Sequence, residues 1–517
     1  MRSQAVHIRS GPPAGTSQAP PLRRLLDSSA RVGLAGAARL HSSGVSLDGS
    51  IPAHPSSALA AASADPNRPW DPLAGWIARR YAGSFWRLGF EAGLLLLLLV
   101  PLYLLRGPRL VLLAVAAVVG IAGAATAFAR PRTTLAVLVF ILFSGIDALV
   151  PGPLTYGLLA VIAARLAFDA LDGQGVDWGA PLHRLALAVL LAACLTSLLA
   201  VWDFAATLMA ARQIVIGGLL FAAISRYTTT FAGVRRIVLV LTLGLSLAAL
   251  LPLEALGSLG GLGMAAFGEA RFMTLGSGDP NVSAAQINCA LPGAFYLAAW
   301  LPRRWRGPMW LVIVLLIAGV ILSSSRAGMA VMGLVVPACL LFERRLHRHA
   351  MWIVLALIAT LLVLPAPYWV RFVSIGQFGG IIVDRSLQLR QHSLAASWDM
   401  FVHHPWIGVG LGNVQSNMPR YMMLRLMAHN TWIEIAASLG AVGIVAYATW
   451  WFTGVRMAWQ ARARSRHNRQ DEAAALAFAT AASLLAFGIV GMTLSIPFYP
   501  MLWLPLALAT VLRRLSA

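Results

Sequence analysis

The chain has 517 residues, of which 59% are hydrophobic and only 11% are charged, and its mean hydropathy is +0.74. This composition excludes a water-soluble globular protein, because no polar surface could cover so much apolar area. The net charge of +21 comes mainly from arginine clusters between apolar runs and in the N-terminal tail, which is typical of membrane topology, so no nucleic acid partner is expected.

Residues 1–75 are rich in Ala, Ser, Pro, Gly and Arg and have no sustained helical or strand period. They are expected to form a disordered cytoplasmic arm, and they lack the pattern of a conventional signal peptide. The remaining segment, 76–517, is expected to be a single transmembrane domain.

Apolar stretches that are long enough to cross a hydrocarbon core of about 30 Å as helices follow one another along this segment. We expect an all-α, polytopic membrane protein with about 12–14 transmembrane helices, since the short pairs around Arg106–Arg109 and Ser323–Arg326 could each be one broken element. The expected spans are 89–105, 109–128, 133–150, 153–171, 183–201, 206–224, 236–255, 284–300, 309–324, 327–342, 351–368, 430–452, 475–492 and 495–512.

When these spans alternate, most arginine clusters fall on one side, which the positive-inside rule makes the cytoplasm. The opposite, periplasmic side receives the segment 256–283, the Ser323–Arg326 turn, a long loop over 369–428 and the short turn 495–500. The clustered residues are Arg79, Arg80, Arg130, Arg132, Arg235, Arg236, Arg303, Arg304, Arg344, Arg345, the stretch Arg456–Arg469, Arg513 and Arg514.

The three cysteines, Cys194, Cys289 and Cys339, all lie inside apolar runs. They lack the paired spacing and nearby histidines of a metal or redox site, so we interpret them as buried thiols. No Asp-x-Asp motif lies in an outer loop, and we expect neither a metal site nor a cofactor.

The outer side keeps some arginines although the positive-inside bias should deplete them. Arg212 lies in the first turns of its span and either serves a site or snorkels to lipid headgroups. Arg271 opens a glycine-containing segment that ends in Asp279-Pro280-Asn281, before a helix. The alternative for Arg271 is a loop position beside a capping turn, in which Asp279 or Asn281 caps the helix.

Arg326 follows three serines in Ser323-Ser-Ser-Arg-Ala-Gly328, between two apolar runs. It is either a functional guanidinium at the outer face or a charge that marks the tip of a hairpin.

The loop 369–428 is too long for a simple connector, so we expect it to be functional or disordered. Within it, Arg385–Val402 has the pattern of an amphipathic helix that could lie on the outer leaflet, and Arg390 extends the basic surface. Trp398 and Trp406 could stack on sugar rings or belong to an interfacial aromatic belt.

His429, Asn430 and the residues up to Glu434 open a long apolar helix that carries Gly440 and Gly443. A histidine at a membrane mouth is a candidate general base, because its ordinary pKa of about 6.5 lets it accept a proton near neutral pH. The alternative is an interfacial residue of the helix N-terminus, with Asn430 or Thr431 as the cap. His403 and His404, which lie in the same long loop, could serve as bases too. The two glycines favour close helix packing.

Four motifs occur in order and together resemble those of the bacterial O-antigen ligase and polymerase superfamily, whose members move a glycan from a polyprenyl diphosphate carrier to an acceptor hydroxyl. The motifs are Arg271 to Asn281, Ser323 to Gly328, Pro405 to Gly412, and His429 to Gly443.

The resemblance implies a glycosyltransferase of the inner membrane that uses an undecaprenyl diphosphate-linked glycan on the periplasmic face. His429 would be the catalytic base and the arginines would bind the diphosphate without a metal, so direct displacement would invert the anomeric centre. The implied diphosphate-binding residues are Arg271, Arg326, Arg212 and Arg390, and the implied supporting residues are Asn281, Asn430, Gly440 and Gly443.

Three functions remain open. The first is a ligase of lipopolysaccharide biosynthesis that passes the whole glycan to lipid A-core. The second is a polymerase that passes it to another lipid-linked repeat of O-antigen or exopolysaccharide. The third and least favoured is a transporter or flippase of lipid-linked glycans, against which stands the clustering of polar residues on one side. The first is preferred.

Overall fold

The computed structural model describes residues 120–148, 154–250, 273–275, 277–347, 349, 351, 353, 355 and 385–517. All of them belong to one unit, Trp76–Ala517. The described residues form helices joined by turns and loops and contain no strand, which confirms the predicted all-α class. The predicted arm, the spans 89–105 and 351–368 (except for single residues of the latter) and most of 109–128 lie outside the described residues.

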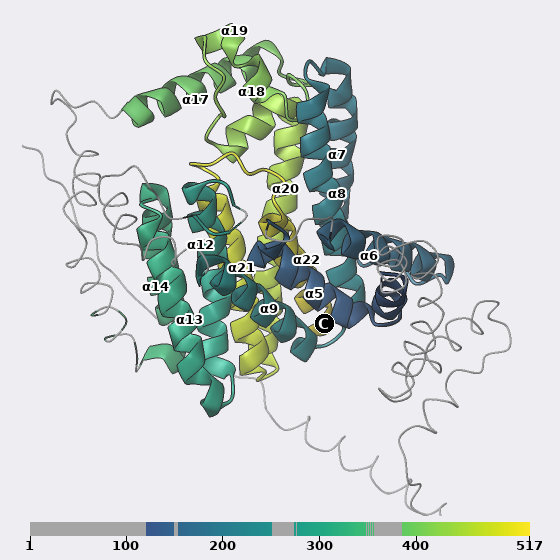
Figure 1. The fold of residues 1–517 in the computed structure, drawn as a ribbon, viewed down its shortest axis with the longest axis vertical. Coiled ribbons are helices and arrows are strands. Elements are labelled where there is room, and N and C mark those ends of the chain that lie inside the picture. Colours follow the sequence, from purple (N-terminus) through teal and green to yellow (C-terminus); the bar gives the residue numbers. More distant parts are fainter. Residues whose placement is uncertain are drawn as a thin grey trace, which may run out of the picture. The chain divides into compact units, whose positions relative to one another are not determined.

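Figure 1 shows how the described helices are arranged. Their bounds are α5 Pro131–Ser144, η1 Ile146–Ala148, α6 Leu154–Leu171, α7 Pro181–Thr196, η2 Ser197–Ala200, α8 Phe204–Tyr227, α9 Phe231–Leu250, α12 Pro280–Trp300, α13 Arg303–Leu322, α14 Arg326–Phe342, η3 Arg344–Leu346, α17 Arg385–His403, α18 Val414–Asn417, α19 Pro419–Met422, α20 Thr431–His467, α21 Asp471–Val490 and α22 Pro500–Leu515.

Among the described residues, 7 helices are long and apolar enough to cross a membrane, or 8 if the bent pair Gly120–Ala129 and α5 counts as one span. The bend of that pair is 115° and falls at Arg130. The predicted limits lie within six residues of the observed helix ends except in α20. This helix was expected to end near residue 452 but continues to His467, because its arginine-rich end remains helical beyond the apolar part.

Helix α12 lies at the centre of the bundle, where it packs against α9, α13, α14 and α21. Its side chains from Val282 to Ala299 are buried except that of Gln286, which is half-buried. Small residues permit this close packing: a Cβ on Gly328 of α14 would overlap Ala284 of α12. The three cysteines are buried and free, as predicted.

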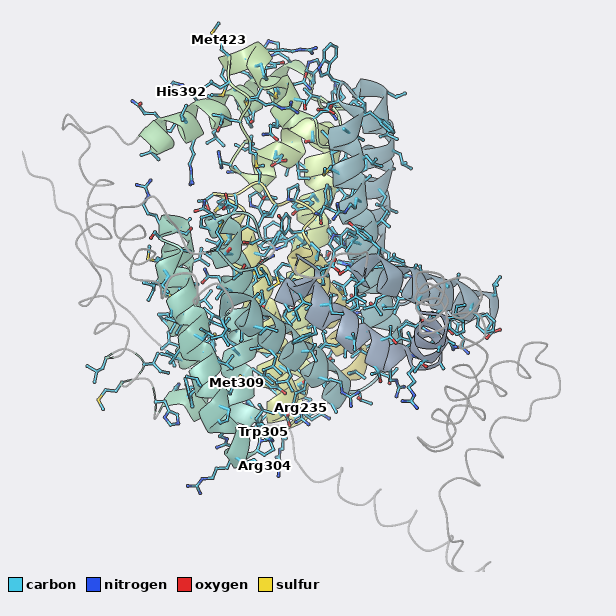
Figure 2. The ribbon with its side chains drawn as sticks, viewed as in Figure 1. Arg235, Arg304, Trp305, Met309, His392 and Met423 are labelled. Carbon is cyan, nitrogen blue, oxygen red and sulfur yellow. The ribbon has the colours of Figure 1, made fainter. Side chains whose placement is uncertain are left out.

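The two ends of the bundle differ in charge. Arg235 and Arg304 lie at one end, and His392 and Met423 lie at the other (Figure 2). At the arginine-rich end, Arg235 pairs with Glu472 of α21 at 2.8 Å. These positions agree with the alternation that the arginine clusters predicted, and we call this end the basic end and the opposite one the outer end.

The described part of the long predicted loop, 385–428, is folded and forms a layer at the outer end. The predicted amphipathic helix is present as α17, and residues of α17, α18 and the segment after α19 share a small core with Ala437 of α20. The buried Asn413 ties this layer to the bundle, since its amide oxygen accepts from the backbone of Trp202 and Asp203, and its amide nitrogen donates to Thr207 at 2.7 Å.

A matched pair of glycines on α8 tests this packing. A Cβ on Gly217 would overlap the indole of Trp503 in α22, whereas a Cβ on Gly218 would meet no atom within 4 Å. We expect Gly217→Ala to destabilise the protein by about 1–3 kcal/mol through overpacking, and Gly218→Ala to be neutral or to stabilise it by up to about 1 kcal/mol through helix propensity. Thermal unfolding in detergent measures both, and equal effects would contradict the packing described.

Candidate active site

Helix α20 is broken at Gly440, a position that only glycine occupies without strain. Gly440 has φ 69° and ψ −169° inside an otherwise helical run, and a Cβ there would overlap the carbonyl of Trp406. The break frees carbonyl groups of the preceding turn, which need other donors because they lie inside the protein.

The Pro405–Gly412 motif supplies those donors. The backbone N–H of Val409 donates to Ala437 at 2.8 Å and that of Gly410 to Ser438 at 3.1 Å, while Ala441 donates to Pro405 at 2.7 Å. Gly408, Gly410 and Gly412 all have positive φ, which suits glycine. The glycine motif therefore fastens the outer layer to the break in α20.

His429 lies directly before α20. Asn430 is the N-cap, since its side chain accepts from the N–H groups of Trp432 and Ile433 at 2.9 and 3.1 Å. Thr431 anchors this end to the turn after α21, because its hydroxyl donates to Leu494 at 2.6 Å. His429 itself has φ 53° and a half-buried side chain. It thus precedes the helix rather than forming its first residue, and its backbone conformation is uncommon for a side chain with a Cβ.

The N-terminus of α12 carries the end of the Arg271–Asn281 motif. Asp279 is the N-cap and accepts from the N–H groups of Asn281 and Val282 at 2.6 and 3.1 Å. Ser283 accepts from the backbone of Thr274 at 2.9 Å, so the segment before the helix is tied to its first turn. Asn281 lies in that first turn, and Arg271 lies outside the described residues.

Arg326 is the first residue of α14, after the N-cap Ser325. The buried Asn288 of α12 joins the two helices there, donating to Ala284 and to Gly328 at 2.8 and 2.9 Å. The N-termini of α12 and α14 therefore lie side by side. Helix N-termini carry partial positive charge and free N–H groups that favour anions.

His429 comes together with residues from three other elements. Burial, then the nearby charge of Arg390 on α17, lowers the pKa of His429, and the carboxylate of Asp279 opposes this shift. Tyr499, just before α22, lies close to the same carboxylate: burial, then the charge of Asp279, raises its pKa. At neutral pH the site thus holds a neutral imidazole and a protonated phenol.

The other candidate side chains described here, those of Arg212, His403 and His404, are more exposed than that of His429. Arg212 on α8 is exposed, and its guanidinium carbon lies 5.2 Å from the ring centroid of Tyr156 in α6, so its part in the site stays a prediction. His403 is exposed, and its ring nitrogen bonds to the carbonyl of Asp399 at 2.8 Å. His404 is exposed too. Of the three histidines, His429 is the one in a partly buried, charged environment.

Asp279 and Tyr499 were missed as site residues. From its position before the helix, Asp279 was interpreted only as a possible cap, and Tyr499 was not singled out in its short outer turn. A signal existed, because both are polar residues at the outer ends of predicted spans. Their proximity, however, follows from the packing of α12, α20 and α22, which the sequence does not reveal.

The fold and site define a multi-pass helical membrane protein with a histidine, an arginine and helix N-termini gathered at one end. Residues 311–448 match the family described as O-antigen ligase. This match confirms the resemblance to the O-antigen ligase superfamily seen in the motifs. It contains three of the four motifs, and Arg212 and the Arg271–Asn281 motif precede it. No curated protein matches the chain. The matched segment therefore supports a glycan-processing membrane enzyme of the ligase and polymerase type.

Proposed function

We propose that this protein is an O-antigen ligase of the bacterial inner membrane, which transfers a glycan en bloc from undecaprenyl diphosphate to a hydroxyl of lipid A-core on the periplasmic face. The observation that carries the proposal is the position of His429, which is half-buried, interacts electrostatically with Arg390 and Asp279 and lies within the matched O-antigen ligase segment.

His429 is the general base of the proposed reaction. The acceptor oxygen attacks the anomeric carbon, the imidazole takes the hydroxyl proton, and the bond from that carbon to the diphosphate oxygen breaks with its electron pair leaving on the carrier. The lowered pKa of His429 keeps the imidazole neutral, as a base requires. Direct displacement inverts the anomeric centre, so retention of configuration would contradict this scheme.

The diphosphate is proposed to lie against Arg390, Arg326 and the N-termini of α12 and α14, with Arg271 and Arg212 as further candidates. Guanidinium groups bind phosphate oxygens bidentately and keep their charge. Fixed cations and helix N-termini stabilise the charge that develops on the leaving oxygen. We propose that these groups suffice without a metal ion.

The pH dependence of transfer tests the assignment of the base. Because the pKa of His429 is lowered from its ordinary 6.5, the neutral form persists to lower pH, and kcat/KM should fall only on acidification below 6.5. Replacing Arg390 with glutamine removes a positive charge, so it should raise the pH at which kcat/KM falls to half. It should also weaken donor binding. A profile of kcat/KM against pH for both proteins measures this, and a wild-type midpoint above 6.5 would contradict the assignment.

The proposed function is tested with purified protein in detergent, an undecaprenyl diphosphate-linked glycan, and either lipid A-core or a second carrier-linked repeat as acceptor, with and without EDTA. Extension of lipid A-core that survives EDTA supports a metal-independent ligase. Extension of the second repeat would instead establish the polymerase. Absence of transfer to either acceptor by a folded protein, with movement of the donor across vesicles, would favour the transporter.

A further inference from the structure

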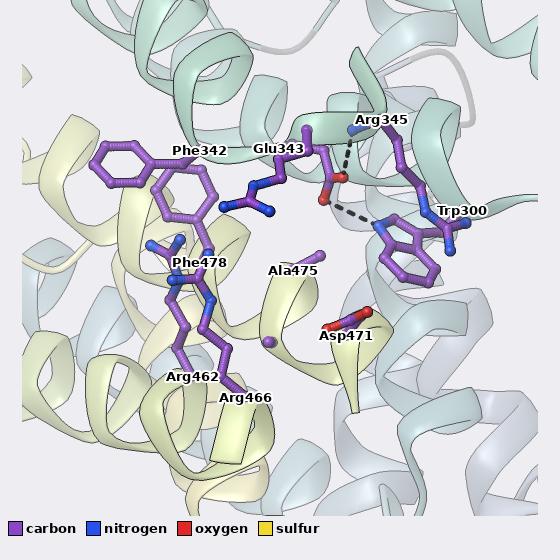
Figure 3. A pocket seen from close by; sticks show the side chains of 11 residues that line it. Trp300, Phe342, Glu343, Arg345, Arg462, Arg466, Asp471, Ala475 and Phe478 are labelled. Atoms are coloured by element: carbon purple, nitrogen blue, oxygen red, sulfur yellow. Dashed lines mark hydrogen bonds between the residues drawn. The ribbon is translucent and has the colours of Figure 1, made fainter. Parts of the chain in front are cut away.

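A charged cavity lies at the basic end, far along α20 from His429. Its volume is about 340 Å³, and α14, η3, α20 and α21 contribute to its lining. Figure 3 shows that Arg462 and Arg466 of α20 extend side by side toward Phe342 and Phe478. No motif of the sequence pointed to this cavity, and the proposed glycan transfer does not use it.

Arg462 is the unusual residue of the cavity, because it is a buried cation. It is 5% exposed, and its Nη1 atom has no hydrogen-bond partner among the described residues. Its guanidinium carbon lies 5.0 Å from the ring centroid of Phe342, 5.0 Å from that of Trp459 and 4.7 Å from that of Phe478. The rings hold the cation by cation–π attraction, but they offer no acceptor in the plane of its N–H groups.

The carboxylates of the cavity bond to other groups or are fewer than its guanidinium groups. Glu343 accepts from the indole of Trp300 at 3.0 Å and from the backbone of Arg345 at 3.1 Å, as the dashed lines in Figure 3 show. Asp471 also lines the cavity. Against these two carboxylates, the lining has four guanidinium groups, from Arg344, Arg345, Arg462 and Arg466.

We propose that this cavity binds a phosphate anion, with the headgroup of an anionic phospholipid as its source. A phosphate oxygen in the cavity would accept from the buried N–H of Arg462 and be shared with Arg466, one helical turn further on. The exposed apolar surface next to it, from Leu341 and Phe342, suits an acyl chain. Basic pockets between helices at the cytoplasmic boundary are where such headgroups bind, and this end of the bundle is the one predicted to face the cytoplasm.

The test measures the melting temperature of the full-length protein in detergent while phosphatidylglycerol, phosphatidylcholine or inorganic phosphate is added. Phosphatidylglycerol should raise the melting temperature of the wild type. Arg462→Gln and Arg466→Gln should each lower the apparent affinity at least about tenfold. Arg464→Gln is the matched control, because it removes the same charge from an exposed position of the same helix that does not line the cavity.

Each outcome decides the proposal. Loss of the response in Arg462→Gln and Arg466→Gln but not in Arg464→Gln supports it. If Arg462→Gln fails to fold, the exposed Arg466 still provides the comparison. A response to inorganic phosphate equal to that to the lipid would keep the anion site but make its source soluble. Equal responses in all four proteins, or equal effects of phosphatidylcholine, would overturn the proposal.

Discussion

Replacing His429 with alanine should lower the rate of glycan transfer by about 10²–10⁴-fold, the usual contribution of a positioned general base. The imidazole lies before the N-cap of α20, where His429 has a left-handed backbone conformation and a half-buried side chain that interacts electrostatically with Arg390 and Asp279. Because the donor would still bind through the arginines, kcat should fall far more than KM rises. Single-turnover transfer from a labelled lipid-linked glycan measures this.

His404→Ala is the matched control, since His404 is an exposed histidine of the same outer layer. It should retain close to wild-type activity. If instead His404→Ala were inactive and His429→Ala active, both folded by thermal unfolding, the base would have been assigned to the wrong residue.

Gly440→Ala should destabilise the protein by about 2–6 kcal/mol and abolish transfer. A left-handed conformation costs a residue with a Cβ about 1–3 kcal/mol, and overpacking adds about 1–3 kcal/mol, here because the new methyl group would overlap the carbonyl of Trp406. Relief of that overlap would separate α20 from the Pro405–Gly412 motif. Thermal unfolding reports the loss of stability, and hydrogen exchange at the amides of Val409 and Gly410 reports the separation.

Gly333→Ala is the control for this substitution, because a Cβ at that helical position meets no atom within 4 Å. It should leave stability and activity close to those of the wild type. Unchanged amide protection at Val409 in Gly440→Ala would show that the break in α20 does not depend on a glycine.

The helices were largely predictable, because apolar length and arginine placement report directly on the membrane. The end of α20 was not, since a helix leaving the apolar region can remain helical while its hydropathy falls. The break at Gly440 also escaped prediction. The glycine was expected to allow close helix packing, and it does approach Trp406 closely, but its positive φ depends on a partner 30 and more residues earlier in the chain.

The motifs of the candidate site could be predicted from the sequence, but the contacts that bring its residues together could not. The sequence singled out His429, Asn430 and Arg390, and Asn430 proved to be the helix cap that was weighed as one alternative. Which arginine lies beside His429 is decided by how α17 packs on α20, a contact between segments with no shared pattern. For the same reason Asp279 was noticed only as a cap.

The fit of Trp503 against Gly217 also has a consequence for biogenesis. Helix α8 enters the membrane early in synthesis, yet the side chain that fills its glycine notch belongs to α22, near the end of the chain. At about 5–20 residues per second of translation, Trp503 is synthesised on the order of tens of seconds after Gly217. During that interval the Gly217 face of α8 lacks the indole that packs against it in the folded protein.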